Sequence, residues 1–150
     1  MSRAVPILAF VLSLAACDLG PSEPRVTVED AVVTLPAVPG RPGAAYFELR
    51  TNNDPTRLAG ITSPGIERVE LHETVTVGGI SQMIPLRSST FGPETPMRFE
   101  PGGRHVMLFG IDPALRPGDR VRLDFAFDPA PPVSVEAEVR AAGDVGHGGH

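Results

Sequence analysis

The sequence contains a single cysteine, no tryptophan and one tyrosine in 150 residues. One cysteine cannot form a disulfide within the chain, so a disulfide-stabilised scaffold and a C-x-x-C thiol pair are both excluded. Basic residues are few: 13 Lys and Arg stand against 18 Asp and Glu, giving a formal net charge of −5. This negative excess argues against nucleic acid as a partner. A Ser-His-Asp motif and a phosphate-binding glycine loop are also lacking, so we expect no enzyme.

Helical periodicity is missing as well, and the 17 prolines and 16 glycines would interrupt most helices. Short β-like runs alternate instead with Pro- and Gly-containing turns. No internal repeat is visible. This pattern favours a single all-β domain, either a sandwich or a barrel. The candidate strands are residues 26–29, 31–35, 44–51, 57–62, 68–74, 97–99, 105–109, 120–127 and 133–139.

The longest apolar run lies at the N-terminus, where residues 4–14 (AVPILAFVLSL) follow a basic residue. The run has the length of a signal peptide and is too short to span a bilayer as a mature helix. It ends in Leu14-Ala15-Ala16-Cys17, which resembles a bacterial lipobox. We therefore expect residues 1–16 to be a lipoprotein signal peptide and Cys17 to be lipidated. The alternative is an ordinary secretory signal that leaves the cysteine as a free thiol.

Three further segments follow from this division. Residues 17–25 comprise the lipidated cysteine and a short polar tether, which would hold the protein at a membrane without a transmembrane helix. Asp18, directly after the cysteine, weakly favours the inner membrane. Residues 26–140 form the domain, which is long enough to build its own core. Residues 141–150 (AAGDVGHGGH) are expected to be a flexible tail.

Four residues with soft or borderline donor atoms form the most informative motif. His72, Met83, His105 and Met107 are spaced as H-x10-M-x21-H-x-M in a chain that has only four His and four Met. A thioether is a soft, neutral sulfur ligand and imidazole is a borderline nitrogen ligand, a combination that suits Cu(I) better than hard cations. An exported protein meets an oxidising compartment, where these ligands outlast free thiols. The motif therefore predicts a Cu(I) site.

Strand alternation predicts where these side chains lie. In the strand 68–74, His72 falls on the face opposite Val69 and Leu71, near the end of the strand. His105 and Met107 share one face of their strand, while the apolar residues between and after them supply the inward face. Met83 lies in an irregular apolar segment, 82–85. Taken singly, each residue has an ordinary structural explanation, and only the four together predict a metal site.

The motif and its surroundings resemble the periplasmic copper chaperone family known as PCuAC. The resemblance covers roughly residues 26–140 and extends to five further segments in family order: Ala44-Ala45-Tyr46-Phe47, Thr51-Asn52-Asn53, Val69-Glu70-Leu71-His72-Glu73, the run from Pro101 to Leu108, and the run from Leu115 to Asp119. It implies a cupredoxin-like or immunoglobulin-like β-sandwich that binds one Cu(I) per chain. It also implies that His72, Met83, His105 and Met107 are the ligands. Many relatives are soluble, whereas this chain carries a lipidation signal.

The resemblance further implies a bacterial periplasmic protein, which we expect to be a monomer. Its recipient would be the CuA site of cytochrome c oxidase subunit II, another copper chaperone or another periplasmic cuproprotein. Copper storage or tolerance is an alternative, and so is a metal-independent, lipid-anchored β-sandwich that binds a protein partner. An electron-transfer cupredoxin is excluded, because a blue-copper site needs a cysteine thiolate and the single cysteine of this chain lies at the far N-terminus.

The C-terminal tail offers a second candidate site. His147 and His150 flank two glycines at the end of the chain. Paired imidazoles on a glycine-rich segment can chelate Cu(II), which is harder than Cu(I). The alternative is a tail that contains histidine without a metal-binding role.

Overall fold

The computed structural model describes residues 25–144, which form ten strands and no helix. Within that range no helix is long and apolar enough to cross a membrane. The all-β prediction is therefore confirmed. The strands are β1 (Val26–Thr34), β2 (Gly43–Thr51), β3 (Thr56–Thr62), β4 (Ile66–Val77), β5 (Ile80–Pro85), β6 (Thr90–Phe91), β7 (Met97–Phe99), β8 (Arg104–Ile111), β9 (Arg120–Asp128) and β10 (Val133–Arg140).

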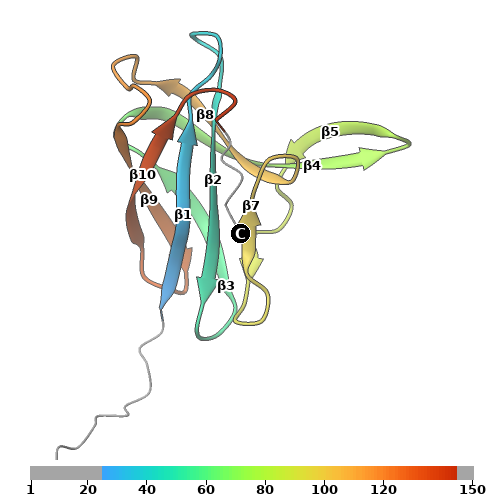
Figure 1. Cartoon of the computed structure of the whole chain (residues 1–150). Coiled ribbons are helices and arrows are strands. Elements are labelled where there is room, and N and C mark those ends of the chain that lie inside the picture. The colour runs from blue at the N-terminus through green and yellow to red at the C-terminus, as the bar shows by residue number, and fades with distance from the viewer. Residues whose placement is uncertain (1–24, 145–150) are drawn as a thin grey trace, which may run out of the picture.

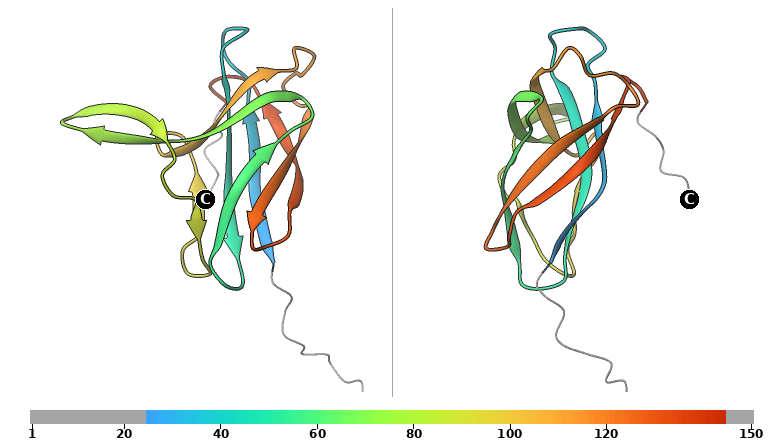
Figure 2. Two further views of the ribbon diagram at one scale, coloured as in Figure 1. Left: turned by 180° about the vertical axis from the view of Figure 1, so that it is seen from behind. Right: turned by 90° about the vertical axis from the view of Figure 1, so that its left-hand side faces the viewer.

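The strands are hydrogen-bonded into one open, mixed sheet that curls into two layers (Figures 1 and 2). The order is β5-β4-β8-β2-β1-β10-β9-β3-β6, with β7 also paired to β2. The β1–β10 pair is parallel and the other named pairs are antiparallel. Strands β5 and β6 end the order, so each has one free edge.

The core lies between the two layers and follows from period-two alternation. In β2, Ala45, Phe47 and Leu49 are buried, while the residues between them face outward. The ring of Phe47 stacks on that of Phe99 at 4.5 Å and meets the edge of Phe125, on β9, at 4.9 Å. Burying a large apolar side chain contributes about 1.5–3 kcal/mol. The inner faces therefore hold the layers together and leave the outer face of β4, β8 and β2 available for a site.

Strand β1 is continuous, although two strands were predicted over its length. Asp30 has a φ of 53°, and the register with β2 shifts between Glu29 and Val32. This is a β-bulge, which adds a residue to one strand without ending the pairing. The polar Glu29-Asp30 pair interrupts the apolar pattern at the bulge, which is why the sequence suggested a break.

The hairpin formed by β4 and β5 extends away from the body of the molecule (Figures 1 and 2). Strand β4 pairs with β8 from Ile66 to Glu73 and with β5 from His72 to Val77. We call the part beyond Glu73, residues 74–85, the arm. Its turn is Gly78-Gly79, with φ angles of 59° and 80°, which is the conformation that a tight two-residue hairpin turn requires. The predictions that β4 ends at Thr74 and that segment 82–85 is irregular were wrong.

Candidate metal centre

His72 and His105 lie directly opposite each other on neighbouring strands, β4 and β8. Their ring centroids are 6.0 Å apart and the rings are tilted by 32°. His105 is 8% exposed, and the side chain of His72 is 17% exposed. The prediction that His72 lies near the end of its strand was wrong. Because β4 continues to Val77, His72 lies in the middle of the strand. Pairing to both β5 and β8 holds its backbone in place.

The hydrogen bond of His105 defines which of its nitrogens is free. Its Nδ1 lies 3.0 Å from the carbonyl oxygen of Gly103. A carbonyl oxygen only accepts, so Nδ1 carries the proton and donates, and the lone pair of the neutral ring is on Nε2. That Nε2 is buried and has no hydrogen-bond partner. The turn at Pro101-Gly102-Gly103 thus orients the ring.

His72 shows the opposite arrangement. Its Nε2 lies 3.0 Å from Oε2 of Glu70. A carboxylate only accepts, so Nε2 donates and the lone pair of the neutral ring is on Nδ1. Nδ1 is also buried without a partner. Leaving a buried acceptor unsatisfied costs about 1–3 kcal/mol, and such atoms are rare in native proteins. Of the five such side-chain atoms among residues 25–144, two lie on these facing histidines, where one shared ligand would satisfy both.

The two methionines share a pocket with His105, whereas His72 is not among the residues that line this pocket. Met107 is half-buried on the same outer face of β8 as His105, opposite Glu70 on β4 and Ala44 on β2. Met83 lies on the arm, opposite Thr74, and is 64% exposed. Met83, His105 and Met107 line one pocket of about 400 Å³. The pocket is completed by Thr34, Leu35, Pro42, Gly43, Ala44, Tyr46, Thr74, Pro101 and Gly102.

The donor set determines what this centre can bind. Two imidazole lone pairs and two thioethers, without a thiolate, are the ligands that Cu(I) accepts well. Metal–imidazole bonds are about 2 Å long, so rings 6.0 Å apart leave room for one metal ion between them. Among residues 25–144 no group of three or more His, Cys, Asp or Glu side chains is placed to hold a metal ion. The four candidate donors are two imidazoles and two thioethers.

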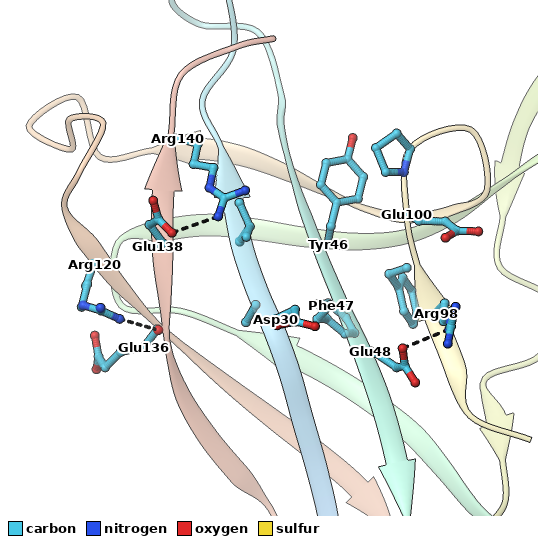
Figure 3. A pocket seen from close by; sticks show the side chains of 14 residues that line it. Asp30, Tyr46, Phe47, Glu48, Arg98, Glu100, Arg120, Glu136, Glu138 and Arg140 are labelled. Atoms are coloured by element: carbon cyan, nitrogen blue, oxygen red, sulfur yellow. Dashed lines mark hydrogen bonds and ion pairs between the residues drawn. The ribbon is translucent and has the colours of Figure 1, made fainter. Parts of the chain in front are cut away.

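A second, larger pocket of about 830 Å³ lies on the same outer face, across β10, β1, β2 and β7 (Figure 3). Within residues 25–144, no histidine or methionine lines it. Two of its arginines are in ion pairs: Arg98 lies 3.0 Å from Glu48, and Arg140 lies 3.0 Å from Glu138. Tyr46, on β2, lines both pockets. Burial raises the pKa of its phenol above the ordinary value.

Sequence reasoning singled out the four candidate donor residues but missed the groups that orient the two histidines. Strand alternation puts Glu70 on the same face as His72, yet nothing in the sequence marked it as a hydrogen-bond partner. Tyr46 was noted only as part of a family signature. Three predicted site residues, Cys17, His147 and His150, lie outside the residues that the structure describes.

Comparisons with known sequences place the chain in a family. Residues 26–139 match the family model described as "Putative lipoprotein LpqE-like". "Uncharacterized protein RP573" of Rickettsia prowazekii (strain Madrid E) is 32% identical over 87 residues, which cover 57% of this chain and 48% of that protein. The chain thus spans about half the length of this relative. "Putative lipoprotein Lxx21020" of Leifsonia xyli subsp. xyli (strain CTCB07) is 28% identical over 134 residues, or 83% of this chain and 81% of that protein.

Solved structures with the same fold include two studied with copper. The copper-bound PCuAC domain from PmoF2 aligns with a TM-score of 0.63 at 21% identity, covering 77% of this chain and 92% of that one. The Cu(I) form of DR1885 from Deinococcus radiodurans aligns with a TM-score of 0.61 at 25% identity, covering 75% of this chain and 76% of that one. The predicted PCuAC resemblance and the cupredoxin-like all-β fold are thereby confirmed.

Proposed function

The chain belongs to the LpqE-like family, and from this premise we propose that it is a Cu(I) chaperone of the cell envelope. It holds one Cu(I) per chain through His72, Met83, His105 and Met107. The observation that carries the proposal is the pair of buried imidazole nitrogens on facing strands that have no partner among the described residues, one of them on His105, which shares a pocket with the two thioethers. The solved structures of similar fold support it, because two of them are described with copper.

The exposure of the donors favours delivery over storage. His72 and His105 are held rigidly within the sheet, whereas Met83 is 64% exposed on the arm. A recipient can therefore approach on the Met83 side and replace the thioether first, while the imidazoles still hold the ion. Neutral ligands also bind Cu(I) without the thiolate that would retain it more firmly. Cytochrome c oxidase subunit II, at its CuA site, and other periplasmic cuproproteins remain the proposed recipients.

The location and the tail complete the proposal. Lipidation of Cys17 would keep the chaperone at the periplasmic side of a membrane, and the lipoprotein descriptions of the family and of the Leifsonia relative support this. His147 and His150 would provide an auxiliary Cu(II) site that is independent of the main one. Comparing Cu(II) binding of the mature chain before and after truncation at residue 144 tests that second site.

The main test is a Cu(I) competition titration of residues 18–150 against a bicinchoninate-type chelator under reducing conditions. We expect one tight equivalent, which the truncated chain ending at residue 144 retains. The double variant His72→Ala/Met107→Leu should lose it, because an imidazole and a thioether are removed together. If the wild-type chain fails to compete with the chelator, the chaperone proposal is wrong and the metal-independent alternative takes its place.

A further inference from the structure

We propose that Glu70 is a positioning residue for the metal centre: it fixes the ring of His72 so that Nδ1 faces the metal. The inference rests on the proposed function and adds a residue outside the four-donor motif. Glu70 is not itself a donor in this proposal. It acts through His72, in the way that carboxylates behind metal-bound histidines fix the tautomer and the orientation of the ring.

The carboxylate of Glu70 is fully engaged on both oxygens. Its Oε2 accepts the hydrogen bond from Nε2 of His72 at 3.0 Å, and its Oε1 lies 3.0 Å from a guanidinium nitrogen of Arg68. The three residues are two positions apart on β4, so their side chains share the outer face of that strand. Each oxygen thus has its own partner, and Oε2 is the atom that holds the imidazole.

Arg68 is anchored in turn to the neighbouring strand. Its guanidinium carbon lies 4.1 Å from the centre of the Phe109 ring, directly across from it on β8. A cation over an aromatic face is attracted to it, and the ion pair with Glu70 restricts the guanidinium further. The row Phe109–Arg68–Glu70 thus links β8 to the back of the His72 ring. This row gives the ring a fixed orientation before any metal arrives.

The orientation matters because a half-turn of the His72 ring would exchange Nδ1 with a carbon atom. The hydrogen bond at Nε2 would then be lost, so Glu70 selects one of the two orientations. Nδ1 is the nitrogen that the structure leaves buried and unpartnered. His105 reaches the same end by another route, through the carbonyl of Gly103. The two facing rings therefore leave different nitrogens without a partner among the described residues, Nδ1 of His72 and Nε2 of His105.

The test combines imidazole NMR of the metal-free protein with the chelator competition assay on residues 18–150. In the wild type, we expect a slowly exchanging Nε2 proton on His72 and a proton-free Nδ1. Glu70→Ala should lose that proton signal and weaken Cu(I) binding by about 10–100-fold, the usual cost of removing such a partner. Glu70→Gln keeps a carbonyl acceptor of the same reach, so it should retain the signal and most of the affinity.

Glu73→Ala is the matched control. Glu73 directly follows His72 on β4, but strand alternation puts its side chain on the face opposite that of Glu70 and His72. It should leave both the proton signal and the affinity unchanged. A His72 proton on Nδ1 in the wild type, full affinity in Glu70→Ala, or equal losses in the Gln and Ala variants would overturn the positioning role. A wild-type chain without Cu(I) binding would overturn the proposed function and, with it, the role of Glu70 toward copper. The three outcomes above would overturn the positioning role and leave the proposed function standing.

Discussion

Met107 is the candidate donor whose packing role and proposed metal-binding role can best be tested separately. It is half-buried on β8 between Ala44 and Glu70. Met107→Leu conserves volume, so the free energy of unfolding should change by less than about 1.5 kcal/mol. The variant removes a soft donor, and we expect Cu(I) affinity to fall by at least about tenfold, the lower limit for losing even a supporting partner. Thermal unfolding and chelator competition measure the two effects. Wild-type affinity in this variant would remove Met107 from the donor set.

Tyr46 provides an optical signal from within the site. It is the single tyrosine in a chain without tryptophan, and it lines the pocket together with His105 and Met107. The emission of the protein therefore reports one position. We expect Cu(I) to change this emission and the change to saturate at one equivalent. Tyr46→Phe should abolish the emission while competition still shows binding. Constant emission during a titration that binds one equivalent would place the metal away from this pocket.

At the scale of single elements, the arm carries Met83 to the pocket that His105 and Met107 also line. The hairpin conformation of the arm depends on its glycine turn. Gly78 and Gly79 both have positive φ angles, and a side chain there costs about 1–2 kcal/mol per residue. The double variant Gly78→Ala/Gly79→Ala should therefore loosen the arm. We expect faster amide exchange in residues 74–85 and weaker Cu(I) binding, while the melting temperature of the body is nearly unchanged.

The control for this prediction is Gly60→Ala. Gly60 lies in β3, has no positive φ, and would place its added Cβ in open space. Amide exchange in the arm and Cu(I) affinity should both stay at wild-type values there. If the turn variant keeps full affinity despite rapid exchange in the arm, Met83 contributes little to holding the ion.

Alternation predicted the faces of β8 correctly, because a strand with one buried side has a fixed period of two. Val106 and Leu108 are completely buried, and Met107 is half-buried on the other face with His105. The pairing of His72 with His105 was beyond that reasoning, since it joins residues 33 positions apart in the chain. The course of β5 was missed because the arm packs against no layer, so its residues lack the alternation that burial imposes.

At the scale of the whole molecule, the candidate site joins elements that the sheet holds with unequal strength. Strands β4 and β8 are paired over most of their length within the body, whereas β5 pairs with β4 and carries Met83 on a free edge. The twelve-residue length of β4 serves both parts, since its first half packs over the core and its second half forms the arm. A metal ion bound to all four donors would therefore link the arm to the body.

This linkage predicts a stability change that depends on the metal. A ligand that binds only the folded state stabilises it by about 2.7 kcal/mol at a free concentration of one hundred times its dissociation constant. For a domain of this size that corresponds to a rise in melting temperature of about 10 °C. We expect Cu(I) to produce this rise under reducing conditions and to slow amide exchange in the arm at the same time.

Zn(II), which prefers thiolates, imidazoles and carboxylates, should give a smaller rise in melting temperature. The His72→Ala/Met107→Leu variant should show neither effect. Stabilisation by Cu(I) without protection of the arm would mean that the ion is held by the body alone, with Met83 left free to meet the recipient.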